Sequence, residues 1–472
     1  MELIVPIGYY KAFFIPIIKR EIMVRLIYYQ FNYRRREWSG AFPVLFSAGV
    51  VVGTCFTILF NVLGNTELFS RVIPAPLFIA PVFFGGLTLF FLISTLIKLL
   101  LNIFKDEYRL WYILGADRRQ LSMLVGGQFA IVTLISSFIG SFISILSAKS
   151  YYYLIQGRVG VDYFPSISIQ FNLLAVFLTI IFLTLVCFAS ATYNAYKLLD
   201  ENIIFEEDKG EKKIYKFTKF GIFGINVFLW LSLVVGSVVV PYLDLPGGVS
   251  YKLSFMSSAI FYLLVIHILF LKYLSPWIEL RIVQFLFKKV KGFATVLSKW
   301  SVIEKKYFLS SVTISMVTAI TLITGLLLIS NNGIRNSVEQ NKEIYISFLF
   351  YLVAPLFIIV ANIISVTIIS SRQDETLSFQ LETLGVSRLQ KIKIRFYESI
   401  IYSVIILIVS LIFNLIITLL VINIVNYTDL LTLNIWYIFS PALLISIAFC
   451  VVIFITKIAV EFYSNSKPDQ NI

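Results

Sequence analysis

Charged residues are scarce in this chain of 472 residues: they make up 14% of it, while hydrophobic residues make up 59%. A soluble globular protein carries about 25% charged residues. The composition therefore excludes an ordinary soluble domain and indicates a protein that is solvated mainly by lipid.

Cysteine and histidine are almost absent. Cys55, Cys187 and Cys450 all lie in apolar runs, and His267 is the single histidine. A metal site or a disulfide framework needs several such residues at defined spacings. We therefore expect the cysteines to act as small buried hydrophobic residues and the histidine as a packed polar one, and we predict no metal site.

Sequence motifs for catalysis are missing as well. The chain has no G-x-x-x-x-G-K-[ST] loop, so it is not expected to hydrolyse ATP. Nothing resembles a nucleophile with its base, so we predict no catalytic residue, no enzymatic activity and no cofactor in this chain. Acidic residues are nearly absent from the apolar segments, where a proton-coupled carrier usually has them. Asn362 and Asn414 lie at membrane depth, and we expect them to hydrogen-bond between helices.

What the sequence does contain is long apolar runs. Ten of them are long enough to cross about 30 Å of hydrocarbon as helices. They lie at 41–62, 77–104, 122–148, 169–196, 220–241, 253–273, 308–330, 344–371, 398–424 and 434–460. The sequence therefore predicts an all-α polytopic membrane protein with about ten transmembrane helices.

Lysine and arginine are distributed unevenly between the two sides of these spans. Of the 39 such residues, one side holds only Arg71, Lys149, Arg158, Lys252, Arg335 and Lys342. By the positive-inside rule, the other side is cytoplasmic, and both termini are expected there. The net charge of +13 is thus a signal of topology in a cell membrane, with the lipid bilayer rather than nucleic acid as the partner.

A polar stretch at 105–128 returns in altered form at 372–398, displaced by 270 positions. In both copies a short helix is expected to end in Leu-Gly, because Gly115 and Gly385 can adopt the left-handed conformation at the C′ position. We name the first elbow (residues 105–118) and the second elbow (residues 372–388) after this turn.

Each elbow is followed by the pattern of a capped helix. Asp117 and Ser387 are expected N-caps, and Gln120 and Gln390 stand three residues later, as in a capping box. Both copies therefore predict a short polar helix, a tight glycine turn and a long apolar helix.

The repeat implies two units of four spans with two spans between them, a 4+2+4 arrangement. An even number of spans separates the copies, so both have the same orientation, which makes the repeat parallel. The predicted division is an interfacial amphipathic helix at 1–40, the first unit at 41–197, a cytoplasmic linker with spans 5 and 6 and a second interfacial helix at 198–307, the second unit at 308–460, and a cytoplasmic tail at 461–472.

Aromatic residues mark two places at the expected membrane surfaces. Tyr28, Tyr29, Tyr33 and Trp38 are expected to anchor the first interfacial helix, and residues 276–301 are expected to form the second. The largest external loop, at 149–168, contains Tyr151, Tyr152, Tyr153, Arg158 and Asp162. These five residues are either an aromatic interface belt or a contact surface for the substrate.

Residues 104–115, FKDEYRLWYILG, followed by Arg118-Arg119-Gln120, resemble the signature of FtsX-like ABC transporter permeases. In that family a basic, acidic and apolar run ends in Leu-Gly before a basic patch enters the next span. The 4+2+4 layout resembles the bacitracin-export (BceB-like) branch, whose members resist peptide antibiotics. The chain departs from that branch because only residues 331–343 stand where its large extracellular domain would be, between spans 7 and 8.

The resemblance implies a permease subunit in a bacterial plasma membrane, working with two copies of a separate ATPase that carries ATP and Mg²⁺. A sensor kinase or another membrane protein is a further partner that it allows. The expected work is export of, extraction of or resistance to a peptide or lipid-like substrate, and the alternative is a secondary carrier or channel. The ATPase-coupling residues would be those of the two elbows: Lys105, Asp106, Glu107, Arg109, Leu114, Gly115, Asp117, Arg118, Arg372, Asp374, Glu375, Glu382, Leu384, Gly385, Ser387 and Arg388.

Overall fold

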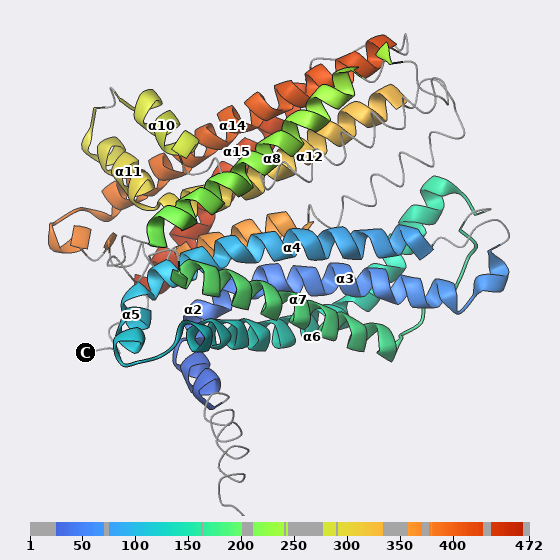
Figure 1. Ribbon diagram of the computed structural model, residues 1–472, viewed down its shortest axis with the longest axis horizontal. Helices are drawn as coiled ribbons and strands as arrows, with labels where there is room; N and C mark the ends of the chain where they lie inside the picture. Colours follow the sequence, from blue (N-terminus) through green and yellow to red (C-terminus); the bar gives the residue numbers. More distant parts are fainter. Residues whose placement is uncertain are drawn as a thin grey trace, which may run out of the picture.

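The computed structural model describes residues 25–69, 75–161, 164–200, 211–239, 242–243, 277–288, 291–333, 357–370, 377–378, 380–427 and 436–465. The regular secondary structure in these ranges is helical, without a strand (Figure 1). This confirms the predicted all-α class for the described part of the chain.

The first half of the chain forms a bundle of long helices. A helix at 25–33 projects from the bundle, across the direction of the long helices (Figure 1). It is followed by α2 (Arg35–Trp38), η1 (Ser39–Ala41), α3 (Phe42–Leu63), η2 (Thr66–Leu68), α4 (Ala75–Ile103), α5 (Lys105–Ile113), α6 (Arg118–Val159) and α7 (Leu173–Asp200).

The second half begins with α8 (Glu211–Val239), which packs beside α14. The remaining elements are α10 (Trp277–Leu286), α11 (Phe293–Glu304), α12 (Lys306–Gly333), a helix at 357–370, α14 (Arg388–Tyr427) and α15 (Trp436–Asn465). The expected second interfacial helix is in fact two helices, α10 and α11. α11 begins directly after Gly292, which adopts φ 119°, a conformation that no helix continues through.

Five described helices are long and apolar enough to cross a membrane: Ser39–Leu63, Arg118–Gly157, Leu173–Lys197, Arg388–Leu419 and Phe439–Ala459. They coincide with expected spans 1, 3, 4, 9 and 10. Helices also lie where spans 2, 5 and 7 were expected, in α4, α8 and α12. Span 8 is described only at 357–370, and span 6, with His267, lies outside the described residues. The count of ten spans therefore stays a prediction.

Small residues bring α3 and α6 into close contact. A Cβ added at Gly140 would lie 2.7 Å from the Phe46 carbonyl oxygen, and one added at Gly49 would lie 3.0 Å from the Ser137 Cα. Backbone approach of this kind is how membrane helices associate when no hydrophobic effect drives them together. Cys55, which is buried on α3, fits the prediction of a small hydrophobic residue.

Hydrogen bonds between helices hold the second half. Asn362 donates to Ser315 Oγ at 2.9 Å, and Asn414 donates to Thr324 Oγ1 at 3.0 Å. These bonds confirm the prediction that both asparagines bond between helices. The two halves also meet directly, since the Val44 backbone N–H donates to Ser365 Oγ at 3.0 Å and α4 packs against α12.

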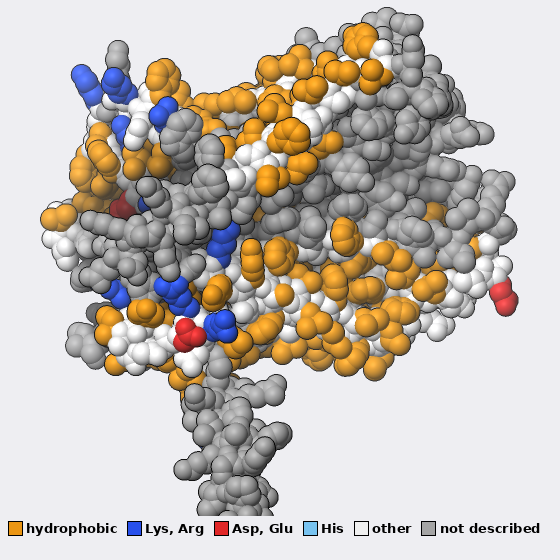
Figure 2. Space-filling model, viewed as in Figure 1, with side chains coloured by type: hydrophobic (Ala, Val, Ile, Leu, Met, Phe, Trp, Pro, Cys, Tyr) orange, Lys and Arg blue, Asp and Glu red, His pale blue; other side chains and the backbone are white. Residues whose placement is uncertain are grey.

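Many described residues on the surface of the bundle are apolar. Figure 2 shows hydrophobic side chains over the flanks, while the visible Lys and Arg gather at the end where α5, α10 and α11 lie. On α6 the exposed apolar side chains are Leu134, Ile135, Phe138, Ile139, Phe142, Ile143 and Leu146. Such a face matches lipid rather than water.

The prediction that Trp38 is an anchor at the membrane surface was wrong. Trp38 is 1% exposed, and its ring packs edge-on against Phe129 with the centroids 5.2 Å apart. Tyr28, Tyr29 and Tyr33 are exposed, as an interfacial role requires. Trp38 was misplaced because its aromatic neighbour lies on α6, far away in the sequence.

Candidate functional site

The first elbow is a helix ended by a glycine turn. The Gly115 N–H donates to the Tyr112 carbonyl at 2.9 Å and the Ala116 N–H donates to the Trp111 carbonyl at 3.0 Å. These two bonds define a Schellman motif with Gly115 at C′, and its φ of 94° is the left-handed conformation that glycine adopts without steric strain. The predicted glycine turn is confirmed.

The second elbow repeats this geometry. The Gly385 N–H donates to the Glu382 carbonyl at 2.9 Å, and the Val386 N–H donates to the Leu381 carbonyl at 3.0 Å, with Gly385 at φ 78°. The same turn therefore forms at the two positions that the 270-residue displacement relates. Both elbows lie at the same end of the molecule (Figure 1).

The helices that leave the elbows are capped as predicted. Gln120 Oε1 accepts a hydrogen bond from the Asp117 backbone N–H at 3.1 Å, and Gln390 Oε1 accepts one from the Ser387 N–H at 3.0 Å. Asp117 completes a capping box at the start of α6. Capping fixes the direction in which each long helix starts, so each elbow is a defined angle rather than a loose loop.

The tips of both elbows expose leucine. Leu114 and Leu384 are each 78% exposed, and Leu110 and Ile113 are exposed on the same helix as Leu114. On the other side of α5, Tyr108 is buried beside Phe104, and burial raises the pKa of its hydroxyl. The first elbow therefore has one face anchored in the bundle and an apolar tip that points away from it.

Charged residues tie the elbows to different neighbours. Glu107 pairs with Arg34, whose guanidinium lies 5.4 Å from the centre of the Phe104 ring, so the first elbow is joined to the segment that precedes α3. Glu382 pairs with Lys391, which also donates to Ser378 at 3.2 Å, so the second elbow is joined to α14. These pairings were not predicted, because the partners are too far apart in sequence to form a pattern.

The remaining predicted coupling residues are placed as follows. The side chains of Arg109, Asp117, Ser387 and Arg388 are exposed at the elbows, and Arg118 is partly exposed. The side chains of Lys105 and Asp106 are not described, and Arg372, Asp374 and Glu375 lie outside the described residues.

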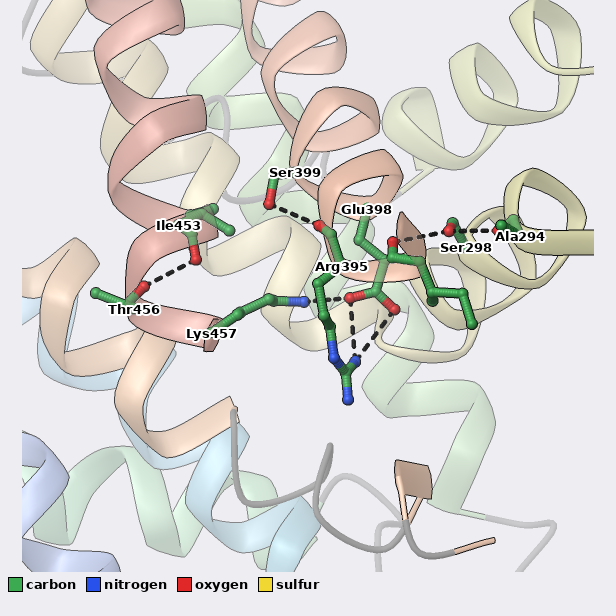
Figure 3. A network of polar contacts seen from close by, with 9 residues as sticks. Ala294, Ser298, Arg395, Glu398, Ser399, Ile453, Thr456 and Lys457 are labelled. Carbon is green, nitrogen blue, oxygen red and sulfur yellow. Dashed lines mark hydrogen bonds and ion pairs between the residues drawn. The ribbon is translucent and has the colours of Figure 1, made fainter. Parts of the chain in front are cut away.

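A buried ionic cluster lies about two to three turns beyond the second elbow, on α14. The Glu398 carboxylate is completely buried, with Lys457 of α15 at 2.6 Å and Arg395 at 3.3 Å (Figure 3). Lys305, between α11 and α12, is also buried beside this group; burial lowers the pKa of its amine to about 7, against the opposing influence of Glu398. A lysine in the apolar run of α15 was the signal in the sequence that could have predicted a buried partner.

The first half has no such cluster at the matching place. Gln128 occupies the position of Glu398, is completely buried, and has neither amide atom hydrogen-bonded within the described residues. The position of Lys457 is occupied by buried Cys187. The two halves therefore share their elbows but differ in the polar chemistry just inside them.

At the opposite end, the loop after α6 folds back on that helix. The Tyr152 hydroxyl donates to the Pro165 carbonyl at 2.7 Å, and the Gln156 amide donates to the Phe164 carbonyl at 2.7 Å. Tyr152 is buried by this contact, Tyr151 is half-buried, and Tyr153 is exposed. Asp162 lies outside the described residues, and the side chain of Arg158 is not described. Of the candidate substrate residues, Tyr153 is thus the described one with an open surface, while Tyr152 holds the loop.

Within the described residues no group of acidic, histidine and cysteine side chains is arranged to hold a metal ion. The described geometry consists instead of two elbows at one end of the bundle, each closed by a hydrogen-bonded glycine turn and each with an exposed leucine at its tip.

Comparison with known proteins points in the same direction. Residues 104–203 match the family described as FtsX-like permease C-terminal. The matched stretch contains the first elbow, α6 and α7. No match was found among curated proteins. An FtsX-like permease domain at residues 104–203 supports this family for the chain, and the family implies a membrane subunit of an ABC transporter, a class that is generally non-catalytic and works with ABC ATPases.

Proposed function

We propose that this chain is a permease subunit that converts the movement of a separate ATPase into tilting of its helices. The observation that carries the proposal is the pair of matched elbows at one end of the molecule, of which the first lies within the FtsX-like match. Each elbow ends in a Schellman turn, and each presents an exposed leucine at its tip.

The elbows are suited to transmit force because they are stiff. A short helix closed by two backbone hydrogen bonds and followed by a capped helix has few soft torsions between its tip and the next span. A partner that binds Leu114 or Leu384 and then shifts would therefore tilt α6 or α14 instead of deforming a loop. Exposed apolar side chains at a protein end outside the lipid are typical of a protein contact surface.

Two elbows imply two docking surfaces, so one copy of the chain would bind two ATPase subunits, which hold ATP and Mg²⁺. We place the elbows and both termini in the cytoplasm of a bacterial cell, in keeping with the uneven distribution of Lys and Arg. The chain would span the plasma membrane ten times in the 4+2+4 arrangement, with the domain limits given above.

The substrate that we infer is a peptide or a lipid-like molecule handled at the outer leaflet, by export or extraction or as resistance to an antimicrobial peptide. The resemblance to bacitracin-export permeases supports this class, and the short segment at 331–343 leaves room for a sensor kinase or another membrane protein to supply the external surface. Tyr153 is the described side chain of the outer loop that is open to such a substrate.

The test is the composition of the complex purified from the cells that naturally produce the chain. Native mass spectrometry of the tagged full-length protein should give two ATPase subunits for each copy. Leu114→Asp or Leu384→Asp should release ATPase, because a carboxylate does not enter an apolar contact. Gly157→Asp, an equal change of charge in open space at the far end of α6, should not.

Two results would contradict the proposal. Two copies of this chain for each ATPase pair would refute two docking surfaces on one chain. A chain that moves its substrate without any ATPase would establish the carrier or channel alternative.

A further inference from the structure

Three charged side chains lie on one face of α14, at the spacing of successive helical turns. Lys391, Arg395 and Glu398 are all buried. Lys391 reaches back to Ser378 and Glu382 of the second elbow, and Arg395 contacts the Glu398 carboxylate from one turn earlier. This face of α14 therefore connects the second elbow to the ionic cluster by side-chain contacts.

The connection continues into α15. Lys457 donates to Glu398 Oε2 at 2.6 Å (Figure 3). Its amine also lies 5.2 Å from the centre of the ring of Tyr402, a further residue of α14. The ion pair is buried on both sides, so water does not weaken it. The elbow, α14 and α15 are thus joined by directional polar contacts.

The first half has none of these charges at the same positions. Leu121, Val125 and Gln128 stand where α14 has Lys391, Arg395 and Glu398, and Cys187 stands where α15 has Lys457. All four are buried. Ionic contact between α6 and α7 at this level is therefore absent from the described residues.

Instead, α6 and α7 meet through a glycine. A Cβ added at Gly126 would clash with Thr192 Oγ1, so the two helices approach closely there. On α14 the residue equivalent to Gly126 is Phe396. Its ring packs edge-on against that of Phe454 on α15, with the ring centroids 5.4 Å apart. The Phe188 ring also lies beside Gly126, but glycine has no side chain that could interlock with it. A contact without interlocking side chains lets packed helices shift slightly along each other, whereas a buried ion pair and an interlocked aromatic pair oppose such a shift.

We propose that Glu398 and Lys457 form an ionic lock that makes α14 and α15 move as one body with the second elbow, while α6 and α7 slide on one another. Glu398, Lys457 and Lys391 are in this scheme positioning residues, since they act through the helices they join. The proposal rests on the proposed function only for the source of the movement, because the lock itself is a property of this chain.

The lock can be measured without any ATPase. Leu384 at the tip of the second elbow and Ile455 on α15 are both exposed, and the equivalent residues of the first half, Leu114 and Leu185, are exposed as well. Each pair would be changed to cysteine in a full-length background lacking the three native cysteines and then spin-labelled. Pulsed electron paramagnetic resonance spectroscopy of the protein in lipid nanodiscs would give the distribution of distances between the two spin labels of each pair.

We expect a narrower distribution for the 384–455 pair than for the 114–185 pair. Glu398→Gln with Lys457→Met, which removes both charges together, should broaden the 384–455 distribution to the width of the first half and leave the 114–185 distribution unchanged. Lys457→Arg keeps the charge and should keep the narrow distribution, which a purely structural role of the lysine stem would not predict.

Equal widths in the unmodified chain would overturn the lock, and so would a narrow 384–455 distribution in the doubly neutral variant. If that variant does not fold, the comparison of the two halves in the unmodified chain and the Lys457→Arg variant still decides the question. Since no ATPase is present, failure of the proposed function would show in the composition of the complex and not in these distances.

Discussion

The two halves of this protein agree at their elbows and disagree immediately beyond them. Gly115 and Gly385 adopt the same left-handed conformation and close the same pair of hydrogen bonds. A few turns further into the bundle, Gln128 has no hydrogen-bond partner among the described residues, while Glu398 is surrounded by cations. The comparison shows that the glycine turn is common to both four-span units. The contact between the two helices that follow it, α6 with α7 and α14 with α15, is built from different side-chain chemistry in each unit.

The contact between α3 and α6 also differs from its counterpart in the second half. In the first half α3 and α6 touch through Gly49 and Gly140, while the second half has Ala319 and Ser410 at the equivalent positions. The second half instead relies on polar links such as Asn414 to Thr324. The first half thus adds close backbone approach to its own interhelical bond between Thr54 Oγ1 and Ser147 Oγ, which lie 2.7 Å apart.

The largest effect should come from the ionic cluster. Glu398→Gln removes the carboxylate that Lys457 and Arg395 contact, and breaking a buried ion pair costs about 3–5 kcal/mol. Gln128→Leu should cost close to nothing, because the amide it removes makes no hydrogen bond within the described residues. Thermal unfolding of the purified variants in detergent measures both. Similar losses of stability in the two variants would show that the halves do not differ in this way.

Close packing of α3 on α6 should give the next largest effect. Gly140→Ala places a methyl group 2.7 Å from the Phe46 carbonyl oxygen and 2.9 Å from the Val50 nitrogen. Overpacking against backbone costs about 1–3 kcal/mol. Ser410→Ala is the matched change in the second half, where a Cβ is already accommodated, and it should be tolerated. The same unfolding measurement decides, and an unaffected Gly140→Ala variant would contradict the close approach.

The glycine turns should respond more weakly and equally in both halves. Gly115→Val and Gly385→Val each force a β-branched residue into a left-handed conformation, which costs about 1–2 kcal/mol. No atom lies within 4 Å of the added Cβ, so the cost is conformational and the spans are untouched. Transport activity should fall while the amount of protein in the membrane stays constant. Full activity of the double variant would show that the turns are not needed.

Lys305 should make the smallest contribution, and one that depends on pH. Its pKa is lowered from 10.5 to about 7 by burial, with Glu398 opposing this and Lys457 and Arg395 adding to it. The unfolded chain therefore binds more protons than the folded one between these values, so stability rises with pH, by about 1 kcal/mol between pH 7 and pH 8. Lys305→Met should remove this rise. Arg35→Met, at the exposed equivalent position of the first half, is the matched control variant, and the pH dependence of unfolding of the two variants is compared.

The sequence by itself determined the elbows. A glycine turn and a capping box are made by residues within five positions of each other, so their bonds are set by local chemistry, and the structure has them at Gly115, Gly385, Asp117 and Ser387. Apolar runs likewise indicated the long helices, since crossing lipid requires continuous hydrophobic length.

Only the tertiary structure decided which residues meet across helices. Trp38 was predicted to be a surface anchor, but in the structure it packs against Phe129 of α6. Glu398 pairs with Lys457, which is 59 residues away in the sequence. Tyr152 was expected at a surface. It is buried because the loop after α6 folds back, and the Pro165 carbonyl of that loop accepts a hydrogen bond from the Tyr152 hydroxyl. Such contacts depend on how whole helices are placed against each other, and no spacing within one helix encodes that placement.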